Sequence, residues 1–304
     1  MTQLLNALPG ALAQGLIWGV MAIGVYITYK VLDIADLTVD GSICTGAAVC
    51  TMLLLGGQSP WLALLCAVLA GVLAGAVTGL LHVGLGIPPI LAGILTQMVL
   101  WSVNLKLLGK ANQALPARTT PVLLSQMDVG GALPVLLGFC VVLVVLLVLF
   151  FGTELGCALR ATGCNPVMSR AQGVNTGLMK VVGLALSNGV VALSGALLCQ
   201  YQGYTDVNMG RGAVVIGLAA VVIGQAVLGR RGGRMAVQLG GVILGAVIYY
   251  IVYQVIIFAG FDTDLLKMFS AVVVAVFLGA PHVKAQLKAH SRSKKGDSGH
   301  AENE

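Results

Sequence analysis

Long runs of apolar residues, separated by short polar stretches, limit what this chain can fold into more than any other feature. Nine such runs cover approximately residues 11–31, 39–56, 60–81, 88–105, 133–152, 178–199, 213–229, 236–258 and 265–281. A helix needs about 20 residues to cross a hydrocarbon core of about 30 Å. Because lipid offers the backbone no hydrogen-bond partner, lipid-facing runs of this kind must be helical. The sequence therefore predicts an all-α, polytopic membrane protein with about 8–10 transmembrane helices, including broken or re-entrant segments.

The composition excludes a water-soluble protein. Only 9% of the residues are charged and 58% are hydrophobic, whereas soluble proteins carry about 25% charged residues. A soluble enzyme and a nucleic-acid-binding domain are therefore excluded as descriptions of the whole chain. The seven cysteines lie mostly within apolar runs, and their spacing is not that of a metal site. We expect them to act as small apolar side chains and expect no bound metal.

Lysine and arginine are distributed unequally between alternate loops. If the N-terminus lies outside, the inside segments hold twelve of these residues and the outside loops hold five. The inside set is Lys30, Arg160, Arg170, Lys180, Arg230, Arg231, Arg234, Lys284, Lys288, Arg292, Lys294 and Lys295, and the outside set is Lys106, Lys110, Arg118, Arg211 and Lys267. Cytoplasmic loops are enriched in such residues. We expect a transmembrane domain over 1–281, a cytoplasmic loop at about 153–177, and a disordered basic cytoplasmic tail over 282–304 close to membrane lipids.

Two polar segments, 33–42 and 200–212, each lead directly into an apolar run. In the first, Thr38 or Asp40 suits the cap of the following helix, whose positive dipole end favours a carboxylate. The same residues also suit a helix that begins inside the membrane beside a water-filled pathway. Both interpretations remain open at this point.

The two polar segments also suggest an internal repeat. Gly41 and Gly46 have the same spacing as Gly212 and Gly217, and small residues follow each pair. The charge count makes the two following helices run in opposite directions, which is typical of an inverted repeat. We therefore expect two broken helices to face each other across a translocation pathway. The predicted pathway residues, chosen from these segments and from polar positions within spans, are Asp40, Ser42, Gln97, Asn188, Asp206, Asn208 and Gln225.

Small residues on the third run form a ridge at Gly71, Gly75 and Gly79. Such a ridge allows close packing of another helix, either within the subunit or across a dimer. Motifs for peptide, ester or ATP hydrolysis do not occur in the sequence. We expect no catalytic residue and no cofactor in this chain, so active transport would take its energy from another chain.

The segment 153–177 is the longest polar connection inside the chain, and it carries a recognisable motif. It is predicted to form a short helix ending at Gly163, a turn at Asn165-Pro166, and a second short helix ending at Gly173. Residues 156–166 (GCALRATGCNP) and 171–175 (AQGVN) resemble the cytoplasmic coupling loop of ABC-importer permeases of the branched-chain amino acid and ribose type. Residues 37–42 (LTVDGS), 88–96 (PPILAGILT), 104–112 (NLKLLGKAN), 206–210 (DVNMG) and 215–219 (VIGLA) are similar to the subgroup paired with aromatic amino acid binding proteins.

The resemblance extends over about residues 10–280 and implies the partners of the chain. They are a second copy of the chain, two cytoplasmic ATPase subunits that bind ATP and Mg, and an extracytoplasmic substrate-binding protein. The location would be the bacterial inner membrane, and the substrate an aromatic or branched-chain amino acid. The resemblance implies that this loop couples the permease to the ATPase. The residues we expect to carry the coupling are Arg160, Asn165, Pro166, Arg170 and Gly173.

Other functions fit the same architecture. A permease for nucleosides or sugars needs no fixed charge in its pathway, and neither does one for amino acids. An ion-coupled secondary transporter with inverted repeats would need no ATPase. A membrane scaffold that transports nothing is a more distant alternative.

Overall fold

The computed structural model describes residues 2–116, 120–228 and 234–258, together with the isolated positions 268, 272 and 275. Apart from these positions, the ninth predicted span (265–281) lies outside the described residues. The predicted basic tail (282–304) and Arg118, Arg230, Arg231 and Lys267 lie outside them as well.

The described helices correspond to the first eight predicted spans, although the first begins at Thr2, well before its predicted run. They are α1 (Thr2–Tyr26), continued by the π-helical turn η1 (Ile27–Val31), α2 (Val39–Leu55), α3 (Pro60–Gly84), α4 (Pro89–Leu108), α5 (Val129–Gly152), α8 (Thr176–Gln202), α9 (Ala213–Leu228) and α10 (Met235–Phe258). Six of them are long and apolar enough to cross a membrane, whereas α2 and α9 are shorter. The all-α class is confirmed. A short antiparallel pair, β1 (Asn112–Ala114) with β2 (Tyr204–Asp206), was not anticipated.

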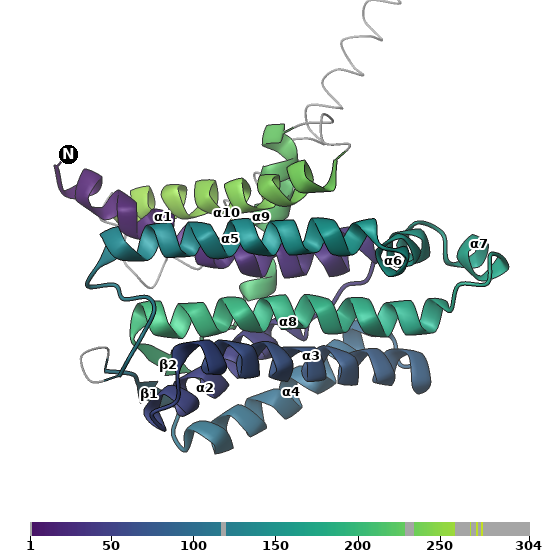
Figure 1. The fold of residues 1–304 in the computed structure, drawn as a ribbon, viewed down its shortest axis with the longest axis horizontal. Coiled ribbons are helices and arrows are strands. Elements are labelled where there is room, and N and C mark those ends of the chain that lie inside the picture. Colours follow the sequence, from purple (N-terminus) through teal and green to yellow (C-terminus); the bar gives the residue numbers. More distant parts are fainter. Residues whose placement is uncertain are drawn as a thin grey trace, which may run out of the picture.

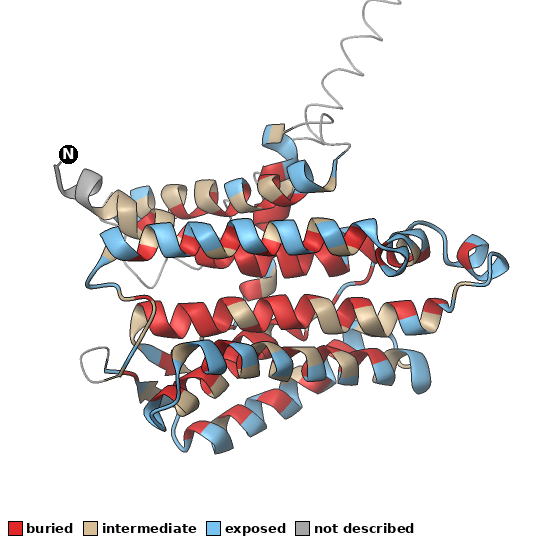
Figure 2. Ribbon diagram, viewed as in Figure 1, coloured by how far each residue is buried: buried red, intermediate tan, exposed pale blue. Residues whose placement is uncertain are grey.

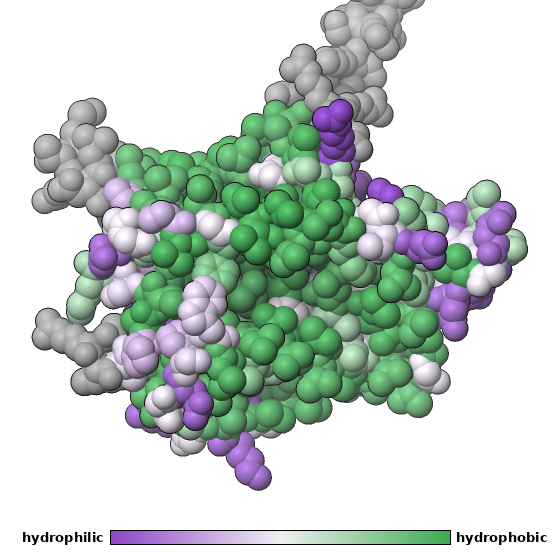
Figure 3. Space-filling model, viewed as in Figure 1, coloured by the Kyte–Doolittle hydropathy of each residue, from purple (hydrophilic) through white to green (hydrophobic). Residues whose placement is uncertain are grey.

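The long helices lie roughly side by side, with short connecting elements at the two ends of the bundle (Figure 1). The short helices α6 (Glu154–Cys164) and α7 (Pro166–Ala171) lie at one end, and β1 and β2 lie at the other. On the face that Figure 3 shows, hydrophobic side chains cover most of the surface between these ends. This distribution is the one that a lipid belt between two aqueous faces requires.

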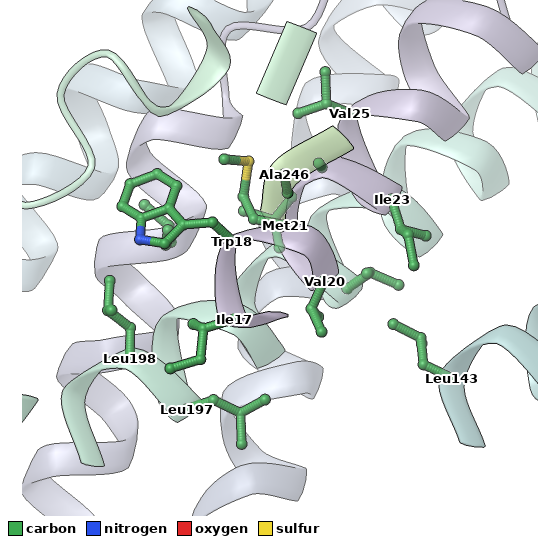
Figure 4. Packing of buried hydrophobic residues seen from close by; sticks show 14 of the residues in the cluster. Ile17, Trp18, Val20, Met21, Ile23, Val25, Leu143, Leu197, Leu198 and Ala246 are labelled. Atoms are coloured by element: carbon green, nitrogen blue, oxygen red, sulfur yellow. The ribbon is translucent and has the colours of Figure 1, made fainter. Parts of the chain in front are cut away.

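Helices α1 and α8 form the interior of the bundle, because they bury most of their residues whereas α3, α4 and α5 remain largely exposed (Figure 2). Around α1, the buried side chains of Ile17, Trp18 and Met21 lie close to Leu197 of α8 and Ala246 of α10 (Figure 4). Exposed apolar residues on the outer helices are expected where the solvent is lipid.

The glycine ridge on α3 packs against α8 of the same chain. A Cβ added at Gly71, Gly75 or Gly79 would collide with backbone atoms of Asn188, Leu184 and Val181, respectively. The ridge therefore serves contact within the subunit, and the alternative of a contact across a dimer is not needed to explain it.

Gly75→Val is expected to lower the free energy of unfolding by about 3 kcal/mol, because the α8 backbone at Leu184 cannot move aside as a flexible side chain would. Gly138→Val is the matched control, since Gly138 lies within α5 with no atom near the position of its Cβ. Thermal unfolding of the two detergent-solubilised variants measures the difference. Equal stability would contradict the packing of α3 on α8.

The two halves of the chain repeat the order long helix, short helix, long helix. α3 packs on α8 as α10 packs on α1, and α2 packs on α8 and α3 as α9 packs on α1 and α10. Gly46 of α2 lies against Ala192 of α8, and Gly217 of α9 lies against Val25 of α1. α1 and α8 run in opposite directions, as do α3 and α10 (Figure 1). The described helices thus have the arrangement of an inverted repeat.

Candidate functional site

The first turns of the two short helices α2 and α9 meet through Asp40. One carboxylate oxygen of Asp40 accepts a hydrogen bond from the Gly212 N–H (3.0 Å), and the other accepts from the Val214 N–H (3.0 Å). These two donors belong to the start of α9, 172 residues or more along the chain. The carboxylate therefore satisfies free N–H groups of α9 and lies at its positive dipole end.

This contact corrects the capping interpretation of the first polar segment. Thr38 occupies the N-cap position of α2, but its side chain makes no capping hydrogen bond. Asp40 caps α9 and not its own helix, because its side chain points across the interface between the repeats. The prediction that the two short helices face each other agrees with this geometry.

The turn before α9 fits closely against α2. The Asp206 carboxylate accepts from the Asn208 N–H (2.7 Å), and the Gly210 N–H donates to the Cys44 Sγ (3.2 Å). A Cβ at Gly210 would collide with the Asp40 carbonyl oxygen, and Gly212 has φ +87°. The Asp206 side chain therefore stabilises the turn before α9, to which Asn208 contributes its backbone N–H. Their role in transport remains a prediction.

Beneath this contact lies a buried polar network that the sequence revealed only in part. The Asn188 amide of α8 donates to the Asp36 carboxylate (2.7 Å) and accepts from the Ser42 hydroxyl (2.6 Å). The Thr38 and Thr78 hydroxyls lie 2.8 Å apart, and the Thr78 hydroxyl donates to that of Thr96 (2.9 Å). This network fixes the start of α2 to α3, α4 and α8.

Beside the network, a hollow of about 560 Å³ opens between α2, α4 and the turn before α9. Its lining includes Asp40 and Gln97 of the predicted set. Ser42 and Asn188 are fully buried and Gln225 is exposed on α9, and none of the three is among its lining residues. The sequence analysis singled out Asp40 and Gln97 for a pathway but did not select Asp36, Asn104 or Arg211.

At the opposite end of the bundle, α6 and α7 form the predicted pair of short helices. The Asn165 side chain caps α7 by accepting from the Val167 and Met168 N–H groups, and Pro166 is the first residue of α7. Arg170 donates to the Thr176 hydroxyl (2.7 Å), and Gly173 has φ +80°. These four residues hold the loop in shape, whereas Arg160 is exposed.

The loop packs against the segment of the chain that leads into the polar network. A Cβ at Gly163 of α6 would collide with the Val31 carbonyl oxygen at the end of η1 and lie close to Leu32. Leu32 in turn packs against Gly183 of α8. Only the short segment 33–38 separates this contact from the first turn of α2.

Residues 8–280 match the family described as branched-chain amino acid transport system / permease component. The chain belongs to this permease family. It is accordingly a multi-pass protein of the bacterial inner membrane, and the family works within ABC transport systems that include ATPase and substrate-binding components.

Individual relatives cover most of the permease. The permease is 37% identical to a tyrosine transport system permease protein of Clostridioides difficile over 287 residues. This alignment covers 93% of this chain and 94% of the relative. The permease is 33% identical over 279 residues to an uncharacterised protein of Rickettsia prowazekii, covering 91% and 98%. An autoinducer 2 import system permease protein of Escherichia coli is 29% identical over 216 residues, covering 67% and 60%. No solved structure matches the permease significantly.

Proposed function

We propose that this permease forms the translocation pathway of an ATP-binding-cassette importer for an amino acid with an aromatic side chain. The observation that carries the substrate class is the similarity, over nearly the whole of both chains, to a permease whose name specifies tyrosine transport. The hollow at the meeting point of the two short helices supports the proposal, because transporter sites form where broken helices of inverted repeats meet.

In this proposal, ATP hydrolysis takes place in a cytoplasmic partner that binds ATP and Mg. The surface for this partner is the α6–α7 loop, where Val167 and Met168 are 77% and 62% exposed. Exposed apolar residues beside an arginine suit a protein interface. A second copy of the permease and an extracytoplasmic binding protein complete the proposed assembly.

The path of coupling follows the contacts between the loop and the site. Motion of α6 moves Val31 and Leu32 through the Gly163 contact. These residues precede Asp36 and the first turn of α2, where Asp40 holds α9. A shift of α6 therefore changes how the two short helices face each other, which is the change that alternating access needs.

Arg160→Glu is expected to reduce the amount of substrate imported per ATP hydrolysed by about tenfold, because reversing a charge at an interface disfavours the correct partner geometry. Arg160 is suited to this test, since its described hydrogen bond reaches only the Cys157 Sγ of its own helix (3.5 Å). Uptake and phosphate release from the same proteoliposomes give the ratio. Arg160→Lys is the control that keeps the charge, and an unchanged ratio in Arg160→Glu would contradict the assignment.

Purification of the tagged permease from its native membrane tests the partners. Recovery of a soluble ATPase at about one copy per permease supports the importer, as expected for a symmetric assembly. Recovery of the permease alone, folded and dimeric, would favour an ion-coupled secondary transporter.

A further inference from the structure

The side chain of Asn104 on α4 is buried without a hydrogen-bond partner. It is 1% exposed, neither its Oδ1 nor its Nδ2 is hydrogen-bonded, and it lines the hollow described above. An unsatisfied buried amide is costly, so it needs an explanation. A bound molecule in the hollow would provide both the donor and the acceptor that this amide lacks.

Asn104 belongs to a stripe of α4 that faces the hollow. Gln97, Trp101 and Asn104 are spaced by four and three residues, which places them on the same face of a helix. All three line the hollow. The stripe therefore offers two amides with an aromatic ring between them.

The two charged residues of the lining have opposite signs. Asp40 lies at the start of α2, and Arg211 lies in the turn before α9. Each Asp40 oxygen accepts one backbone N–H, so each retains further capacity to accept. Arg211 makes no salt bridge with any carboxylate among the described residues, and its guanidinium has five N–H donors.

The remaining lining is largely apolar. Ile94, Met98 and Trp101 project from α4 and are partly exposed, and Val207, which follows β2, is buried. A volume of about 560 Å³ falls within the range of about 300–1,000 Å³ that small-molecule sites occupy. A ligand with opposite charges at one end and an apolar body at the other matches this distribution.

We propose that the hollow binds the head group of a free amino acid in transit. Arg211 pairs with the α-carboxylate, Asp40 accepts from the α-ammonium, and Asn104 hydrogen-bonds the same head group. The apolar side chain of the substrate lies against Trp101 and Met98. This inference rests on the proposed function and adds the residues that select a zwitterion, since nucleosides and sugars lack the paired charges.

Asn104→Leu separates a role in binding from a role in folding. If Asn104 served only to stabilise the fold, replacing it would lower stability, and if it had no role in binding, an apolar side chain of similar size would leave transport intact. We expect the thermal stability of the variant to be unchanged or higher. Its uptake of radiolabelled tyrosine should fall by about tenfold or more, because the substrate head group loses the hydrogen bonds that Asn104 makes to it. Val103→Leu is the matched control, because Val103 is exposed on α4 and is not part of the lining.

Arg211 is tested in the same reconstituted complex of permease, ATPase and binding protein. Arg211→Gln is expected to lower the maximal rate of tyrosine uptake without changing the KM for the loaded binding protein, and Arg211→Lys is expected to restore part of the rate. A raised KM with an unchanged maximal rate would place Arg211 at the binding-protein interface and overturn its assignment.

The wild-type complex distinguishes the two levels of the proposal. If it imports no amino acid with an aromatic side chain, the proposed function is wrong and this inference, which rests on it, fails with it. If it imports tyrosine and Asn104→Leu does so at a rate within twofold of wild type, only the inference about the hollow is wrong.

Discussion

Asp40→Leu is expected to destabilise the permease by about 1–3 kcal/mol, because two N–H groups at the start of α9, one exposed and one partly buried, each lose a charged acceptor. The two groups are those of Gly212 and Val214, which have no other acceptor in the first turn of α9. The start of α9 also loses the negative charge that its dipole favours. Thermal unfolding of the detergent-solubilised variant measures the stability, and uptake by the reconstituted complex should fall by at least about a hundredfold.

Two further substitutions make this prediction specific. Asp40→Asn keeps one acceptor oxygen and places an amide NH₂ against the second N–H, so its stability should lie between that of wild type and that of Asp40→Leu. Asp33→Asn is the control of the same chemistry, because Asp33 is exposed and asparagine also tolerates its φ of 56°. If neutralising Asp40 costs no more than neutralising Asp33, Asp40 does not hold the two short helices together.

The second large effect is expected at Gly163→Val. The new side chain would collide with the backbone of Val31 and Leu32, so α6 must separate from η1 or the fold must absorb the strain. We expect ATP hydrolysis to continue while the amount imported per ATP falls by about tenfold, because the described contact between loop and site is lost.

Gly152→Val is the matched control for this prediction. Gly152 is the last residue of α5, directly before the loop, and no atom lies near the position of its Cβ. If Gly163→Val folds and couples as well as Gly152→Val, the proposed path from α6 to α2 is wrong. A loss of folding in Gly163→Val alone is measured separately by thermal unfolding and would still establish the close packing of α6 on η1.

Hydropathy predicted the helices well because lipid leaves the backbone few choices. α2 and α10 begin and end within one residue of their predicted runs. α5 begins earlier than its run, at Val129, because Asp128 caps it by accepting from the Gly131 N–H. The pattern of apolar residues does not report such a capping contact, so it placed the start of this helix too late.

The site was harder to predict because its contacts join residues far apart in the sequence. Asp40 was selected from its local segment, but its partners lie in the other half of the chain. Asp36 was not selected, although it forms the centre of the buried network with Asn188. Gln225 was selected from its polarity within a span, and only the packing of α9 shows that it lies away from the hollow.

The loop shows the same limit. Its motif predicted two short helices with a turn between them, and α6 and α7 have that form. The motif does not distinguish residues that shape the loop from residues available to a partner. The side chains of Asn165 and Arg170 are engaged within the loop, while Arg160, Val167 and Met168 face outward.

Uptake into proteoliposomes tests the central claim most directly. The permease is reconstituted with its ATPase, the binding protein is added outside with radiolabelled tyrosine, and ATP is enclosed inside. The account predicts accumulation that requires both ATP and the binding protein and that persists when ion gradients are collapsed by ionophores. Accumulation that is driven by an ion gradient and proceeds without the ATPase would contradict it.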